Sequence, residues 1–205
     1  MRIPTFLVAM AVLLGLAAAG CETTVNGRPL PKKGTGEFEE LSPFTAEDIQ
    51  QKLKDVPYLR GQQVVDAGAE VAKIGAAAIP ILQEAASDSD EMRRAFAMNV
   101  MGMIGDRRAL TSLRHGTKDP VTSVRYEAAR ACLRLGDWTT GAPVLIDGLS
   151  DNSIYIRALC NDALRRQTKL DFAFNPKGSE FDRKKSIALW RGWWDRHEKA
   201  TLGMR

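Results

Sequence analysis

A segment of about thirty residues occurs three times in this sequence, and this repeat limits the fold more than any other feature. Residues 82–106, 113–137 and 145–168 align with offsets of 31 and then 32 residues. The shared columns hold leucines, aspartates and arginines: Leu82, Leu113 and Leu145; Asp88, Asp119 and Asp151; Arg94, Arg125 and Arg157. A fixed offset in this range is typical of repeat proteins, in which each unit packs on its neighbours.

Each copy is predicted to be a helical hairpin. In the middle copy the second helix is expected to begin at Asp119-Pro120, because Asp is a preferred N-cap and Pro is tolerated in the first turn. Apolar residues then follow a period of 3.6 and form one buried face: Val124, Ala128, Cys132 and Leu135. Gly136 is expected to end this helix. In the first copy, Asp88 and Glu91 predict a capping box.

An arginine follows an aspartate six residues later in every copy. When hairpins stack, this spacing predicts a column of alternating charges, made of Asp88, Arg94, Asp119, Arg125, Asp151 and Arg157. A guanidinium group can bridge a carboxylate or a helix end with several donors at once. The alternative is a row of arginines that binds an anion. The acid beside each arginine favours the structural role.

These repeats resemble the HEAT-repeat family, in particular its short bacterial, phycobilisome-lyase type. The stretches that carry the resemblance are KIGAAAIPIL, followed by MRRAFAMNVMGMIGD, and VRYEAARACLRLGD. The resemblance covers residues 45–168, with a degenerate first unit in which Val64 takes the place of the arginine. It implies an all-α fold, an α-solenoid of about four HEAT-type hairpins, and the charge ladder between them.

The N-terminus predicts export. Arg2 precedes the apolar run FLVAMAVLLGLAAAG, which is short for a membrane span and typical of a signal peptide over residues 1–20. The sequence Ala18-Ala19-Gly20-Cys21 resembles a lipobox, although lipoproteins prefer Leu where Ala18 stands. This resemblance implies cleavage before Cys21 and lipidation of its thiol; an ordinary cleaved signal is the alternative. In the lipoproteins that this segment resembles, Asp after the cysteine signals inner-membrane retention, so Glu22 at this place implies the periplasmic face of the outer membrane.

Residues 21–44 are rich in Pro and Gly and are predicted to form a flexible tether. A hairpin around Asn26-Gly27 is the alternative, but it has little apolar sequence beside it.

Residues 169–205 are predicted to form an aromatic cap. Ser179 and Asp182 predict the start of a helix that runs to about His197. An open solenoid needs a terminal element to cover its last apolar face, and three tryptophans supply apolar area here: Trp190, Trp193 and Trp194. The alternative is a partner-binding surface made by the same tryptophans, with Trp193 the most exposed because it lies off the main apolar stripe.

The sequence lacks the motifs of common catalytic sites. His115 and His197 are its only histidines and have no ligand-type spacing, so no metal site or cofactor is predicted. Cys132 and Cys160 are expected to lie on the inward faces of neighbouring helices, as free buried thiols or, less favoured by the helix spacing, as a disulfide. We therefore expect no catalytic residue, and a chain that is not an enzyme.

The net charge of +4 is too small for a nucleic-acid-binding class. The sequence predicts a lipid-anchored scaffold or adaptor that binds a protein partner at the bacterial cell envelope. One alternative is a lyase-like or thiol-dependent factor that acts on a partner protein, because some short bacterial HEAT proteins act on bilin-carrying proteins. A nucleic-acid-binding HEAT-like protein is the other, and export disfavours it.

Overall fold

The computed structural model describes residues 24–25, 28–29 and 37–203 of the 205-residue chain. The predicted signal peptide, the lipobox with Cys21, and Glu22 lie outside the described residues. Two compact units divide the chain at Leu30. In the first unit, strand β1 (Thr24–Val25) pairs antiparallel with β2 (Arg28–Pro29). This pairing is the one that the alternative of a hairpin predicts, and Asn26 and Gly27 themselves lie outside the described residues.

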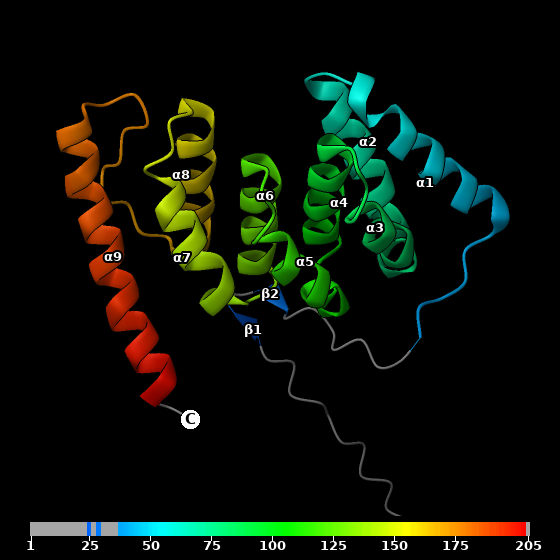
Figure 1. Ribbon diagram of the computed structural model, residues 1–205. Helices are drawn as coiled ribbons and strands as arrows, with labels where there is room; N and C mark the ends of the chain where they lie inside the picture. The colour runs from blue at the N-terminus through cyan, green and yellow to red at the C-terminus, as the bar shows by residue number, and fades with distance from the viewer. Residues whose placement is uncertain (1–23, 26–27, 30–36, 204–205) are drawn as a thin grey trace, which may run out of the picture. The chain divides into compact units, whose positions relative to one another are not determined.

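The second unit is an all-α solenoid, and the predicted fold class is confirmed. Four hairpins follow one another along the chain and a long helix closes the series (Figure 1). The helices, in chain order, are α1 (Pro43–Asp55), α2 (Gln62–Ile74), α3 (Ile79–Ala85), α4 (Glu91–Ile104), α5 (Leu110–Gly116), α6 (Thr122–Arg134), α7 (Trp138–Gly148), α8 (Ile154–Thr168) and α9 (Glu180–Gly203). No helix of the described residues combines the length and the apolar character needed to cross a membrane.

The second helices of the hairpins pack side by side. Helix α4 contacts both α2 and α6, and α6 contacts α8. Helices α4 and α6 approach closely at Gly102, where an added Cβ atom would lie 2.7 Å from the Cβ atom of Ala131. This spacing is possible because Gly102 has no side chain. The stack therefore depends on small residues at the contacts between its repeats.

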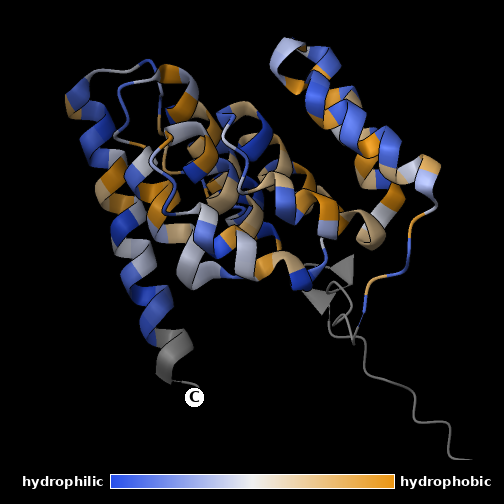
Figure 2. Cartoon of the chain, turned by 45° about the vertical axis from the view of Figure 1, so that its right-hand side comes forward, coloured by the Kyte–Doolittle hydropathy of each residue, from blue (hydrophilic) through white to orange (hydrophobic). Residues whose placement is uncertain are grey.

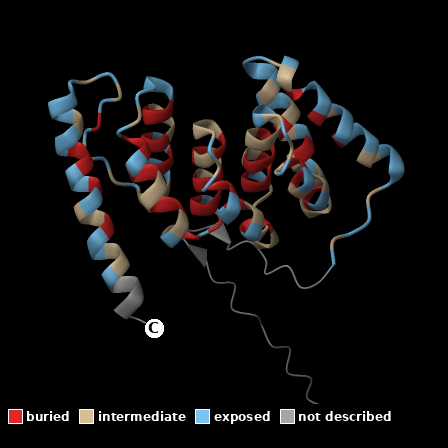
Figure 3. Cartoon of the chain, viewed as in Figure 1, coloured by how far each residue is buried: buried red, intermediate tan, exposed pale blue. Residues whose placement is uncertain are grey.

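The predicted apolar stripe of α6 is the centre of the core. Its four residues, Val124, Ala128, Cys132 and Leu135, are all buried. Buried positions are concentrated on the helices in the middle of the series (Figure 3). The four residues of the stripe belong to a cluster formed with the N-terminal hairpins, whereas Tyr126, Ala129 and Leu133 on the other side of α6 belong to a second cluster with α7, α8 and α9. Helix α6 thus joins the two clusters, and apolar positions recur along the helices on both sides of it (Figure 2).

The second helices begin later than predicted. In each copy the aspartate closes a turn before the helix: Oδ1 of Asp88, Asp119 and Asp151 accepts a hydrogen bond from the backbone N–H two residues on, at 2.7 to 2.8 Å. Helix α4 is capped by Asp90, and α6 begins at Thr122. The predicted capping box at Asp88 and the predicted N-cap at Asp119 are therefore wrong. An Asp side chain that closes such a turn looks the same in sequence as one that caps a helix.

The end of the predicted tether belongs to the folded part. Phe38 and Leu41 pack against the first core cluster, and the guanidinium carbon of Arg108 lies 4.0 Å from the centroid of the Phe38 ring. Arg108 Nη1 also donates to the carbonyl oxygen of Glu37 at 3.1 Å. The segment before residue 45 therefore packs on the solenoid from residue 37 onward, because the side chains of Phe38 and Leu41 contact the first core cluster.

Candidate functional site

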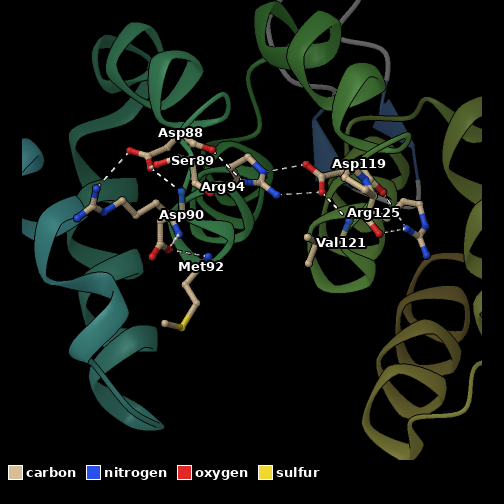
Figure 4. A network of polar contacts seen from close by, with 10 residues as sticks. Asp88, Ser89, Asp90, Met92, Arg94, Asp119, Val121 and Arg125 are labelled. Carbon is tan, nitrogen blue, oxygen red and sulfur yellow. Dashed lines mark hydrogen bonds and ion pairs between the residues drawn. The ribbon is translucent and has the colours of Figure 1, made fainter.

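The contact between Arg94 and Asp119 links two consecutive repeats (Figure 4). Arg94 Nε lies 2.8 Å from Asp119 Oδ2, and Nη2 lies 3.2 Å from Oδ1, so the pair is bidentate. Arg94 Nη1 donates to the carbonyl oxygens of Asp88 and Ser89 at 2.9 and 3.0 Å. One guanidinium group therefore holds the turn of its own hairpin and the turn of the next hairpin.

The other two arginines of the column also hold the turn of their own hairpin. Arg125 Nη1 donates to the carbonyl oxygens of Asp119 and Pro120, and Arg157 Nη1 donates to those of Asp151 and Asn152. Arg125 forms no ion pair with Asp151 among the described residues. Its Nη2 donates to Thr122 Oγ1 instead, at 3.3 Å.

The predicted column therefore has one acid–guanidinium rung. Arg157 continues the series by donating from Nε and Nη2 to the carbonyl oxygen of Pro176, which ties α8 to the C-terminal segment. The offset from the second to the third copy is 32 residues rather than 31, and the missing rung lies at this step.

The pKa of Asp119 reflects its position between the repeats. Burial opposes its ionisation, but the hydrogen bonds from Arg94 and from the Val121 N–H outweigh burial and place the pKa below the ordinary value. The Asp90 N–H likewise lowers the pKa of Asp88. All three arginines of the column donate hydrogen bonds to backbone or carboxylate oxygens. These contacts suit a structural role, and they use N–H groups that an anion would need.

The tryptophans of the predicted partner surface lie mostly inside the cap. Trp190 is completely buried and Trp194 is 7% exposed, while Trp193 is half-buried. The Trp190 ring packs edge-on against two other rings. The distance between ring centroids is 4.7 Å to Phe172 and 5.7 Å to Trp193. A partner-binding surface on Trp190 and Trp194 is therefore wrong, because these indoles cover the last apolar face of the solenoid. Trp193 contacts the rings of Trp138 and His197.

The two described cysteines are free and buried. Burial, with a contribution from the Asp137 charge, raises the pKa of Cys132 to about 12. Burial raises the pKa of Cys160 as well. A thiol acts as a nucleophile in its deprotonated form, so neither side chain is activated for thiol chemistry in this structure. Within the described residues no three His, Cys, Asp or Glu side chains gather closely enough to hold a metal ion.

The outer face of the second helices, from α2 to α8, carries side chains that differ between repeats. We call it the second-helix face. One set of equivalent positions holds Ala69, Asn99, Arg130 and Asp162, and a second set, one turn further along each helix, holds Lys73, Met103, Arg134 and Arg166. Met103 is 40% exposed, and every member of the second set is exposed. The second set is therefore free of the packing that fixes the buried side.

Charged side chains gather where this face passes from α6 to α8. Arg130 pairs with Glu127 on α6, and Arg166 pairs with Asp162 on α8 at 2.7 Å. Around them lies a hollow of about 90 Å³, lined by Arg130, Arg134, Asp162, Ala163, Arg166 and Gln167. Arg134 makes neither an ion pair nor a side-chain hydrogen bond with any residue in the described part of the chain. The sequence alignment did not single out these residues, because they are not identical between copies.

The charges in this cluster act on one another. Burial raises the pKa of Glu127, against the opposing effect of Arg130. Partial desolvation and then the charge of Arg130, with a further contribution from Arg166, lower the pKa of Arg134, although Glu127 and Asp162 act in the opposite direction. The neighbouring guanidinium groups of Arg130 and Arg166 thus disfavour the charge of Arg134.

Comparison with known proteins agrees with the repeat pattern. A sequence profile described as HEAT repeats matches residues 57–134 and again 79–165. Solved structures of similar fold include the complex of CpcE and CpcF of phycocyanin lyase from Nostoc sp. PCC7120, in which the matching chain is 20% identical, with a TM-score of 0.50. The match covers 71% of this chain and 98% of that chain. No protein of curated function matches the sequence.

This structural likeness corrects one expectation. The sequence predicts a chain that is not an enzyme, because it lacks the motifs of common catalytic sites. That conclusion is wrong, since the same fold occurs in the complex of CpcE and CpcF of phycocyanin lyase and so gives no ground for excluding an enzyme. A solenoid of this kind is compatible with a role in catalysis as well as in binding.

Proposed function

This chain belongs to the HEAT-repeat family, and from that premise we propose that it binds a partner protein through its second-helix face while anchored to a bacterial envelope membrane. The observation that carries the proposal is the contrast between the two sides of each second helix. The buried side holds equivalent residues in register, such as Ala97, Ala128 and Cys160, all completely buried. The exposed side is different in each repeat, which a surface needs in order to recognise one partner.

The composition of the face suits a protein partner. An exposed apolar side chain lies on it beside the charged ones, since Met103 is 40% exposed. Exposed methionines are common on binding surfaces because their side chains adapt to a partner. The acids Glu127 and Asp162 interrupt the basic residues of α6 and α8, so the face lacks the continuous positive stripe of a nucleic-acid site.

The membrane anchor is proposed from the N-terminal sequence. The small residues Ala18-Ala19-Gly20 before Cys21 support lipidation of this cysteine after cleavage. Two or more acyl chains hold a protein stably on a bilayer, at about 0.8 kcal/mol per buried methylene. The tether would then leave the solenoid free to meet a partner at the periplasmic face of the outer membrane. Replacing Cys21 with Ala tests this part, because the variant should leave the membrane fraction.

Site-specific photocrosslinking in the cells that make the protein tests the binding face. A photoreactive amino acid is introduced at Met103, on the second-helix face, or at Leu189, which is 53% exposed on α9. We expect one discrete crosslinked product from position 103, identified by mass spectrometry after membrane solubilisation, and none from position 189. Products from position 189 alone would place the binding surface on the cap, and products from neither position would refute partner binding.

A second function is favoured by the structural likeness to the CpcE–CpcF complex of phycocyanin lyase. In this reading the chain acts on its partner protein as a lyase-like factor, alone or with a second subunit. The test uses the partner protein that crosslinking identifies, purified without the crosslink. It is mixed with the purified chain, and its mass is followed over time. A change of mass that depends on the chain supports lyase-like action, and an unchanged partner leaves binding as the function.

A further inference from the structure

We propose that the hollow between α6 and α8 binds a carboxylate from an acidic segment of the partner protein, through the guanidinium groups of Arg134 and Arg166. This inference rests on the proposed function, because it names the chemistry that the second-helix face recognises. It assigns a role to a group of residues that the repeat pattern leaves unexplained.

The hollow brings together charges from two helices. Arg130 and Arg134 come from α6, whereas Asp162, Arg166 and Gln167 come from α8. The volume of about 90 Å³ admits a small polar group but no large ring system. Arg134 and Arg166 are exposed, so an approaching segment reaches their guanidinium groups without any movement of the helices.

The balance of charge selects the ligand. The cluster contains three guanidinium groups and two carboxylates, and each carboxylate is already paired with one of the arginines. One positive charge, on Arg134, remains without a partner in the described part of the chain. A carboxylate carries one negative charge and accepts two parallel hydrogen bonds from a guanidinium group. A doubly charged phosphate would instead leave excess negative charge beside Glu127 and Asp162.

The surroundings favour a protein as the source of the carboxylate. Met103 occupies on α4 the position that Arg134 has on α6 and Arg166 has on α8, so an exposed apolar side chain continues the same row. An acidic side chain with apolar neighbours would contact both parts of this row. An anionic bilayer or a nucleic acid attracts arrays of basic residues that lack interspersed acids.

Binding of a model acidic peptide to the full-length chain in non-ionic detergent tests the inference. The probe is a capped hexaglutamate peptide, with capped hexaglutamine as the neutral comparison and inorganic phosphate as a competitor. We expect Arg134→Gln to weaken hexaglutamate binding about tenfold, as the loss of a charge-assisted hydrogen bond implies. Arg191→Gln removes the same charge from α9, where its nearest acid is Asp147, and should change the affinity less than about twofold. Arg134→Lys keeps the charge without the planar fork and should bind with intermediate affinity.

The possible results separate the explanations. Equal losses in the Arg134 and Arg191 variants, or no binding of hexaglutamate, would overturn the inference in favour of a general positive field. Phosphate that displaces the peptide at equal or lower concentration would make the hollow a site for free anions, which also overturns it. Crosslinking from position 103 is then repeated with Arg134→Gln. Loss of the product supports the inference, and an undiminished product refutes it while partner binding stands; absence of the product in the parent chain refutes the proposed function itself.

Discussion

Replacing Gly102 with Ala tests the stacking of the repeats at a close contact between α4 and α6. Gly102 lies inside α4, where Ala is the better helix former by about 1 kcal/mol. If the helix were isolated, the substitution would stabilise it. In the solenoid, however, the new Cβ atom would lie 2.7 Å from Ala131 Cβ and 3.0 Å from Ala131 Cα. Both separations are shorter than van der Waals contact, and the second involves the backbone of α6.

The two effects have opposite signs, and the structure decides between them. Moving α6 away from α4 or distorting either helix costs about 1–3 kcal/mol in a well-packed core. This exceeds the gain in helix propensity, so we expect Gly102→Ala to lower the free energy of unfolding by about 1 kcal/mol. Gly192 in α9 provides the matched control, because a Cβ atom there meets only Arg196 Nη1, at 3.5 Å. Gly192→Ala should raise the free energy of unfolding by about 0.5–1 kcal/mol.

Urea unfolding followed by circular dichroism at the helical band measures both changes. The slope of the transition must be compared as well as its midpoint, because repeat proteins can unfold in more than one step. The double variant with Gly102→Ala and Ala131→Gly removes the Cβ–Cβ contact and should show a favourable coupling of about 1 kcal/mol. An increase in stability for Gly102→Ala as large as for Gly192→Ala would refute the close packing of α4 on α6.

Three further predictions concern the cap, the rung between repeats and the thiols. Trp190→Ala should lower the free energy of unfolding by about 3–5 kcal/mol in the same urea assay, because a fully buried indole is lost. The pKa of Asp119 is lowered in the folded state, so its contribution to stability is present above the unfolded pKa and is lost as the pH falls below about 4. Asp119→Asn should therefore reduce the fall of the urea midpoint when the midpoint is measured from about pH 6 down to about pH 3. In the native chain Cys132 and Cys160 should resist iodoacetamide at neutral pH, and both should be alkylated after unfolding, as counted by mass spectrometry.

The sequence predicts the helices well because their buried residues follow a simple period. The stripe from Val124 to Leu135 is recognisable from spacing alone, and the structure buries all of its members. The starts of the helices are less predictable. Asp119 accepts the Val121 N–H, and a residue that closes this turn has the same identity as one that caps a helix. The pairing between repeats is also hard to predict. The offset of 32 residues before the third copy is visible in the sequence, but only the structure shows that Arg125 and Asp151 do not pair at this step.

The candidate site is harder to predict, because exposure depends on packing that the sequence does not reveal. Three tryptophans near the C-terminus suit either a cap or a binding surface, and only the contacts of Trp190 with Phe172 and Trp193 distinguish the two. The hollow on α6 and α8 is not predicted by the alignment of the repeats, for a different reason. An alignment of copies emphasises identical residues, whereas Arg134 differs from the Met103 that precedes it in the same row.

This difference separates the arginines that hold the stack from those available to a partner. Arg94, Arg125 and Arg157 repeat because every hairpin has the same turn to hold, and each donates to two carbonyl oxygens of its own turn. Equivalent positions on the second-helix face instead carry an amide at Asn99, a cation at Arg130 and an anion at Asp162. Stacking needs only the buried side of each helix, so nothing in the fold dictates these three side chains. A residue that the architecture does not require, and that forms no ion pair within the described part of the chain, is where recognition of a partner is to be sought, and Arg134 meets both conditions.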